Sequence, residues 1–373
     1  MWNFLRESNN ILLLAPRRVG KTSLMEAMKQ QASARGYKAA FLDLSSVGSE
    51  ANFVLKLLQI IDDPTILKRI AESDVGRLFQ QSVKKISIAG QSIELGTFEE
   101  KDWRTIAERS AQILAGSETP WLFLVDEFPI FINHLRKSDT NRARLFLEWF
   151  RSLRHAARGV RWFLAGSIGL DKVARDAQMS DTINDLHPVR EFGPFTLPVA
   201  HAFIQELGIQ SHFIVPDGVR ERLVEKVGWP IPFHLRLLFD RHRDYCQDQQ
   251  MDPSMETLDA AYDKLILDRA PHMNWWDERL TDLYGDKADR HARTILRTAA
   301  KADSGTSLAT FKSATKKNRA PGDDAEEHDR LVHDLLDALV SDGYLRIETG
   351  ARTNRYVFLS PLLRDYWLRF KTR

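Results

Sequence analysis

The sequence predicts an α/β protein in which a parallel sheet is followed by an all-helical segment and a C-terminal winged-helix domain. Three observations support this prediction. Near-continuous apolar runs alternate with helical patterns in the first half of the chain, which is typical of a parallel sheet covered on both faces. Residues 199–270 read as helices only. The last hundred residues give three helical stretches and a hairpin, the order of a winged helix. The predicted domains are 1–198, 199–272 and 273–373.

The sheet elements follow in order. Apolar runs that end at turn residues predict buried strands at 10–15, 38–45, 121–127, 160–167 and 190–195. Helical patterns lie at 51–83, 99–115 and 141–157. Residues 84–96 alternate apolar and polar around Gly-Gln, as a hairpin would. Further on, the stretches "VPDG", "GWPIP" and "MDPS" separate helices. The final helical stretches, before a hairpin and a last helix, are 286–300, 306–314 and 325–341.

The composition fits a globular protein, with 43% hydrophobic and 28% charged residues. A net charge of +2 neither favours nor excludes a nucleic-acid partner. The single cysteine, Cys246, cannot form an internal disulfide and fits a reducing compartment. The N-terminus lacks the order of a signal peptide, and no apolar run approaches the roughly 18 residues of a membrane span. We therefore expect a cytoplasmic protein with no membrane partner.

A loop between the first predicted strand and helix carries a phosphate-binding pattern. The stretch "LLLAPRRVGKTSL" matches Gly, four residues, then Gly-Lys-Ser/Thr, with alanine in the first place. Gly20 allows the backbone to pass close to phosphates, and Lys21 would reach the β and γ oxygens. The hydroxyl of Thr22 would bind Mg²⁺. The alternative is an ordinary strand-turn-helix with a surface lysine. The expected nucleotide-binding residues of the loop are Ala15, Pro16, Arg17, Arg18, Val19, Gly20, Lys21, Thr22 and Ser23.

The third predicted strand ends in two adjacent carboxylates, in "LFLVDEF". Asp126 is expected to hold Mg²⁺ directly or through water, and Glu127 to act as the general base that polarises a water. Two carboxylates at the end of a buried strand repel each other unless a cation lies nearby. The alternative is a solvated pair of loop carboxylates.

These segments resemble, in order, AAA+-like ATPases of the archaeal-ATPase type. Those proteins belong to the STAND branch and are close to the origin-recognition and Cdc6 ATPases. The resemblance also rests on "WLFLVDEFPIF", "WFLAGSIGL", "GWPIPFHLRLL" and the C-terminal "LVSDGYLRI" with "YVFLSPLLRDYWL". It implies a P-loop NTPase core with strand order 5-1-4-3-2, a helical lid and a winged helix. It also implies ATP and Mg²⁺ as cofactors.

The resemblance assigns further residues. Ser167 falls where the family places a polar sensor near the γ-phosphate, although a plain strand-end serine is the alternative. Gly228 and Pro230 fall on the Gly-x-Pro of the lid, which packs near the nucleotide; a proline that merely starts a helix is the alternative. Origin-type relatives carry a sensor arginine shortly after that glycine. Here Arg236, one turn further on, is a weak substitute, and the adenine-gripping segment is reduced to "FLRES".

An arginine brought to the γ-phosphate accelerates phosphoryl transfer by roughly 10³ to 10⁵. The candidates are Arg151, Arg154, Arg158 and Arg175, and we prefer Arg154. An arginine supplied in trans would make the active form an oligomer. The alternative is that these arginines form a charged, solvated helix face.

The C-terminal segment gives mixed signals about DNA. The presumptive recognition helix is acidic, with Glu326, Glu327, Asp329, Asp334 and Asp337 against Arg330. Such a helix would repel phosphates. Basic residues lie in the neighbouring segment and the wing, namely Lys312, Lys316, Lys317, Arg319, Arg352 and Arg355. DNA binding through wing and loop is one interpretation, and packing or self-association is the other. For Trp275 and Trp276 we expect interdomain packing rather than base stacking.

Three functional hypotheses follow. The first is a Mg²⁺-dependent ATPase that works as a conformational or assembly switch, with a homo-oligomer or a partner protein as the expected associate. Relatives of this kind serve in signalling, mobile elements and phage defence, and the sequence does not choose among them. The second is a DNA-binding ATPase of the loader or initiator type. The third is a nucleotide-bound scaffold without turnover.

Overall fold

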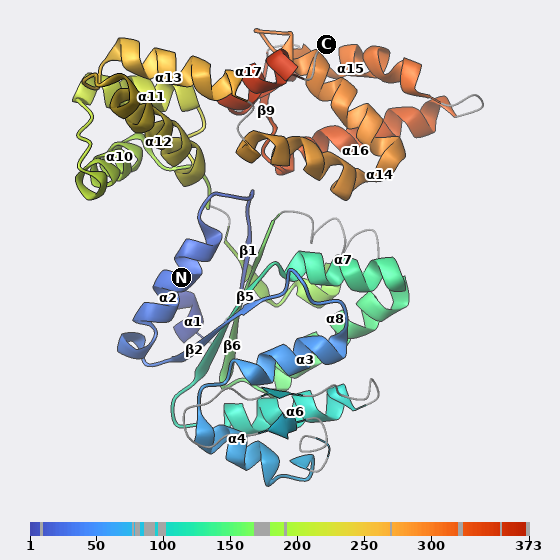
Figure 1. Cartoon of the computed structure of the whole chain (residues 1–373). Helices are drawn as coiled ribbons and strands as arrows, with labels where there is room; N and C mark the ends of the chain where they lie inside the picture. Colours follow the sequence, from blue (N-terminus) through green and yellow to red (C-terminus); the bar gives the residue numbers. More distant parts are fainter. Residues whose placement is uncertain are drawn as a thin grey trace. The chain divides into compact units, whose positions relative to one another are not determined.

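The computed structural model describes residues 1–7, 10–76, 78, 83–85, 94–95, 102–167, 180–189, 192–268, 271–319, 324–350 and 353–370. The chain divides into two compact units (Figure 1). The first comprises Met1–Ala15 and Lys21–Phe192, and the second comprises Pro16–Gly20 and Gly193–Arg373. The predicted division into three domains is finer than this and stays a prediction. Among the described residues, no helix has the length and apolar character needed to cross a membrane.

A five-stranded parallel sheet forms the centre of the first unit. Its strands are β1 (Asn10–Leu14), β2 (Lys38–Asp43), β5 (Trp121–Asp126), β6 (Val160–Gly166) and β7 (Leu186–Pro188). They lie in the order β2-β5-β6-β1-β7, and each neighbouring pair runs parallel. The fold is therefore mixed α/β with a parallel sheet. Because β6 lies between β1 and β5, the carboxyl ends of these three strands meet at one edge.

Helices cover both faces of this sheet (Figure 1). Two short elements, α1 (Trp2–Arg6) and α2 (Lys21–Gln31), lie on one face. The opposite face carries α3 (Glu50–Gln59), α4 (Pro64–Ala71), α6 (Trp103–Ala115), α7 (Phe128–Ser138) and α8 (Thr140–Ala156). Alternate β5 residues serve the two cores: Leu124 packs with the α2 side, and Phe123 and Val125 pack with the larger aromatic core. The remaining elements of this unit are η1 (Ser33–Arg35), β3 (Val83–Lys85), β4 (Glu94–Leu95) and η2 (Ser180–Ile183).

Three sequence predictions for the first unit need correction. The fifth strand is β7, at Leu186–Pro188, and not 190–195, of which residues 192–195 are not strand. The single helix predicted over 51–83 is divided, because Asp63 caps α4 through the amides of Thr65 and Ile66 and Pro64 starts it. Helix α7 was not predicted. By contrast, β3 and β4 pair antiparallel, as the hairpin prediction requires, although the residues between them lie outside the described part.

The second unit is helical up to residue 268. Its helices are α10 (Leu197–Ser211), α11 (Asp217–Val227), α12 (Pro232–Gln249) and α13 (Met255–Leu267). Gly228 ends α11 with φ +64°, a conformation that glycine adopts without strain. Pro232 then occupies the first turn of α12, where its missing N–H costs nothing.

The rest of the second unit surrounds a small antiparallel sheet of order β8-β10-β9. Its elements are α14 (Pro271–Ala300), β8 (Thr306–Ser307), α15 (Leu308–Thr315), η3 (Lys316–Asn318), α16 (Ala325–Ser341), β9 (Leu345–Glu348), β10 (Arg355–Phe358) and α17 (Pro361–Phe370). The inward face of α16 contributes Val332, Leu335, Leu336 and Leu339 to the core. Its carboxylates are thereby left on the outer face.

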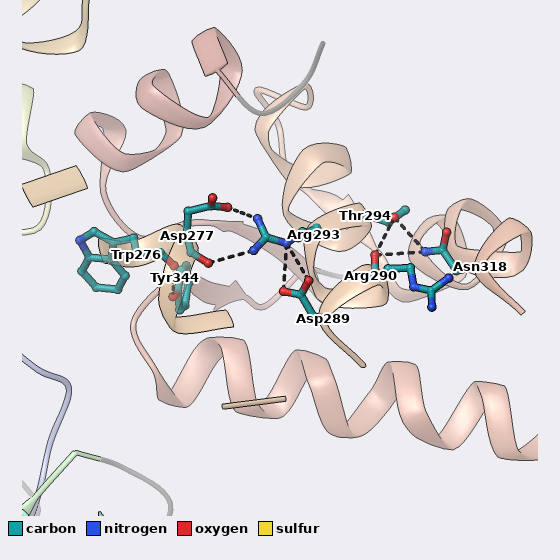
Figure 2. Close-up of polar contacts among 8 residues, drawn as sticks. All are labelled: Trp276, Asp277, Asp289, Arg290, Arg293, Thr294, Asn318 and Tyr344. Carbon is teal, nitrogen blue, oxygen red and sulfur yellow. Dashed lines mark hydrogen bonds and ion pairs between the residues drawn. The ribbon is translucent and has the colours of Figure 1, made fainter. Parts of the chain in front are cut away.

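Helix α14 is bent, as the contacts of Arg293 indicate (Figure 2). Arg293 contacts the carboxylates of both Asp277 and Asp289, the latter through two 2.9 Å hydrogen bonds. In a straight helix Asp277 and Arg293 would be about 24 Å apart, so the helix must bend between them. The Tyr344 hydroxyl also donates to the Trp276 carbonyl, at 2.6 Å. The Trp276 side chain is fully buried, which supports packing over base stacking; that of Trp275 lies outside the described residues.

Candidate functional site

Three segments that are distant in sequence meet at the carboxyl edge of the sheet. β1 leads into Ala15, β5 ends at Asp126, and β6 is followed directly by Ser167. Parallel pairing fixes their relation, because Leu14 lies opposite Gly166 and the Ala15 amide donates to the Gly166 carbonyl at 3.3 Å. Ala15, Asp126 and Ser167 are each at most 6% exposed. The fold thus brings residues from separate sequence motifs together at a buried position at the carboxyl edge of the sheet.

The loop after β1 uses unusual backbone conformations. Gly20 has φ +99° and Arg18 has φ +66°. Glycine adopts such angles freely, whereas for arginine they are uncommon. Lys21 then begins α2, and its ammonium group donates to the Ala15 carbonyl at 2.9 Å while the side chain is 6% exposed. The lysine therefore ties the two ends of the loop together at the start of a helix, where backbone amides favour anions.

The middle of this loop, Pro16–Gly20, belongs to the second compact unit. Within that unit the Arg18 guanidinium lies 3.9 Å from the centre of the Phe233 ring, a cation–π contact. Burial, together with the charge of Arg18, lowers the pKa of His234 to about 3, so this histidine is neutral at ordinary pH. The chain thus passes from one unit to the other and back within the predicted phosphate loop.

Thr22 and Asp126 form the central polar contact of the site. The Thr22 hydroxyl donates to Oδ2 of Asp126 at 2.7 Å, across 104 residues of sequence. The amide of Glu127 donates to Oδ1 at 2.9 Å and so fixes the direction of the carboxylate. Two oxygens in adjacent positions around Mg²⁺ lie about 3.0 Å apart, given metal–oxygen distances near 2.1 Å. The hydroxyl and carboxylate therefore fit a magnesium ion with a shift of a few tenths of an ångström.

Glu127 has a left-handed backbone, with φ +53° at the N-cap position of α7. A non-glycine residue in this region costs about 1–2 kcal/mol, and such residues cluster at functional sites. The side chain is partly buried beside the Asp126 strand end. Its position next to the predicted metal ligand is consistent with the role of a base.

Ser167 and its neighbour Gly166 lie between the other two strand ends. Ser167 is 5% exposed. A Cβ placed on Gly166 would come within 2.2 Å of Pro129 Cδ, at the start of α7. Glycine is therefore required where β6 passes the segment that carries Glu127. Ser167 was predicted from the sequence, whereas Gly166 was not, because its place beside Ser167 is the one sequence feature that marks it.

Arg154 does not lie where a trans-acting arginine would. Its side chain is 1% exposed and forms a two-bond ion pair with Asp185, at 2.9 and 2.6 Å. It also donates to the Thr182 carbonyl at 2.9 Å. A guanidinium engaged in this way holds α8 to the segment before β7 and cannot reach another chain. These contacts favour a structural role for Arg154, and its predicted role at the γ-phosphate stays a prediction.

The other predicted site residues are placed as follows. Arg151 is partly exposed and lies 3.7 Å from Asp181, Arg158 is exposed, and Arg175 lies outside the described residues. In the second unit, the Pro230 carbonyl accepts from the Phe195 amide at 3.0 Å. Arg236 is exposed and bonds to Asp240. Arg17 is partly buried and Ser23 is exposed.

Comparison with known proteins identifies the fold only. No protein-family model matches the chain, and no match was found among curated proteins. Among solved structures, it is similar to the Walker-type ATPase PABY2304 of Pyrococcus abyssi, with a TM-score of 0.63 and 16% identity over 99% of this chain and 94% of that one. It is also similar to the ORC2 protein of Aeropyrum pernix in its ADPNP–ADP complexes, with a TM-score of 0.59 and 13% identity over 98% and 89% of the chains.

Proposed function

We propose that this chain is a Mg²⁺-dependent ATPase whose nucleotide cycle drives a conformational or assembly switch. The observation that carries the proposal is the 2.7 Å contact between Thr22 and Asp126. It joins the phosphate-loop motif to the acidic strand end, as a magnesium–triphosphate site requires. The similarity to Walker-type and ORC2 structures agrees with this chemistry.

Each residue has a role in the proposal. The α2 amides and Lys21 would hold the β and γ phosphates, and Thr22 and Asp126 would hold a metal that neutralises charge on the phosphates. Glu127 would accept a proton from the attacking water, and Ser167 would contact the γ-phosphate. Pro230 and the loop residues Ala15 to Ser23 line the nucleotide. Since Arg154 is engaged internally, the exposed Arg158 and the partly exposed Arg151 are the remaining described candidates for an arginine supplied in trans.

We infer the switch from the path of the chain between the two compact units. The segment Pro16–Gly20 of the phosphate loop belongs to the second compact unit, whereas Ala15 and Lys21 belong to the first. We further propose that α10–α13 form the lid and that α14–α17 with the small sheet form a winged helix. A regulatory ATPase of the STAND type fits this organisation, whether it serves signalling, a mobile element or phage defence.

The test is phosphate release measured with ATP in Mg²⁺ and in excess EDTA. We expect Lys21→Ala to lose nucleotide binding, and Glu127→Gln to bind ATP but release phosphate at least about 100-fold more slowly. Lys29→Ala and Glu118→Gln, on exposed residues of the same types, serve as matched controls with unchanged rates. Equal turnover in all four variants would remove the site assignment.

Two alternatives have distinct outcomes in this assay. Tight ATP binding without phosphate release by the unmodified chain would favour a nucleotide-bound scaffold. Strong stimulation by duplex DNA would favour a loader-type ATPase. Of the basic residues on which the DNA alternative rests, Arg355 donates to the Ser304 carbonyl, whereas Lys316 and Lys317 are exposed. We do not adopt this alternative, because the neighbouring helix α16 carries exposed carboxylates that would repel phosphates.

A further inference from the structure

The C-terminal part of the second unit is strongly divided in charge. Residues 289–319 contain eight lysines and arginines against two aspartates, a balance of +6. Residues 324–348 contain eight carboxylates against two arginines, a balance of −6. The whole chain carries only +2. The small net charge of the whole chain therefore does not reveal two neighbouring segments of equal and opposite charge.

The basic segment presents an exposed surface, which we call the basic strip (Arg290, Arg297, Lys316 and Lys317). Arg290 and Arg297 are seven residues apart and so share one face of α14. Asn318 joins η3 to that same face, because its side-chain amide donates to the Arg290 carbonyl at 3.2 Å and to Thr294 Oγ1 at 2.9 Å (Figure 2). Lys316 and Lys317 directly precede Asn318, so all four cations gather around this junction.

The acidic segment presents its charge on the outer side of α16, which we call the acidic face (Glu326, Glu327, Asp334 and Asp337). These residues are exposed, while the opposite side of the helix is buried. Ion pairs with the described residues leave most of this charge unneutralised. Among the described residues, Asp337 is the one carboxylate of this face with an ion-pair partner, His333, at 3.5 Å.

We propose that the basic strip docks onto the acidic face of a second copy of this chain. Opposite charges steer the two surfaces together, and each copy supplies both halves of the contact. A nucleic acid would use the basic strip alone and would be repelled by the acidic face beside it. The balance of +6 and −6 therefore favours a second copy over a polyanion. The proposal does not depend on the nucleotide site.

The test is a charge exchange followed by light scattering coupled to size-exclusion chromatography. One variant, Lys316→Glu with Lys317→Glu, makes the strip acidic; the other, Asp334→Lys with Asp337→Lys, makes the face basic. We expect the unmodified chain to associate at low salt and to dissociate near 1 M, where the Debye length is about 3 Å. Each variant alone should associate at least about 100-fold more weakly, because like charges then oppose each other.

Mixing the two variants should restore association, since each then supplies the surface that the other needs. Lys29→Glu with Lys137→Glu, an equal charge change on exposed residues of the first unit, should leave association unchanged. Melting temperatures verify that each variant is folded. The proposal fails if the unmodified chain is monomeric at low salt, or if the mixture of the two charge-exchange variants does not associate. If duplex DNA binds the Asp334→Lys, Asp337→Lys variant but not the Lys316→Glu, Lys317→Glu variant, and the two variants form no mixed complex, the basic strip would be assigned to nucleic acid instead.

Discussion

The ion pair between Arg154 and Asp185 makes a quantitative prediction that separates a structural arginine from a catalytic one. The pair is nearly closed to solvent, with Arg154 1% and Asp185 15% exposed. Removing one partner of such a pair leaves a buried charge uncompensated, which costs about 3–5 kcal/mol. In a unit of this size each kcal/mol lowers the melting temperature by about 2–4 °C. Asp185→Ala should therefore lower it by about 6–20 °C.

The double variant Arg154→Met with Asp185→Leu removes both charges and should recover most of that loss, because a well-packed apolar pair is often as stable as a buried ion pair. Differential scanning calorimetry measures the stability, and phosphate release measures the activity. A catalytic arginine predicts the opposite pattern, with an unchanged melting temperature and activity lost in the double variant. That result would refute our assignment of Arg154 to structure.

Two further predictions concern single positions. Burial lowers the pKa of His242 to about 4, so the unfolded chain takes up the proton first as pH falls below about 6.5. The free energy of unfolding should then fall by about 1.4 kcal/mol per pH unit, or about 3 kcal/mol in total by pH 4. In urea unfolding, His242→Gln should flatten this dependence on pH. Gly166→Ala should push Pro129 and the start of α7 aside, slowing phosphate release by about 100-fold, and Pro129→Ala in the same chain should restore part of the rate; an unchanged rate in Gly166→Ala would contradict this.

The sequence was informative wherever a single local pattern decides the structure. The apolar runs of β1, β5 and β6 identify buried strands, and the spacing after Ala15 identifies the loop. Parallel pairing then brings Asp126 and Ser167 to the edge where that loop begins. The contact between Thr22 and Asp126 follows from this topology, which explains why it could be anticipated across more than one hundred residues.

The errors arose where distant pairing decides the outcome. β7 has only three residues and owes its existence to pairing with β1, so no periodicity marks it. The ion pair between Arg154 and Asp185, 31 residues apart, was likewise not predicted, because nothing in the spacing of the arginines indicates it. The bend of α14 was likewise not predicted, because a helical pattern does not reveal that Arg293 contacts Asp277.

At position 127, the backbone conformation favours a residue other than the one that the proposed catalysis needs. The φ of +53° at Glu127 is a conformation that glycine accepts without penalty. A glycine there would relax the chain by up to about 1–2 kcal/mol yet, under the proposed function, remove the proton acceptor. Selection of variants at position 127 for thermal stability alone should therefore enrich glycine, which under the proposed function gives a more stable but inactive protein. Valine and isoleucine, whose side chains branch at Cβ, should be depleted at this position.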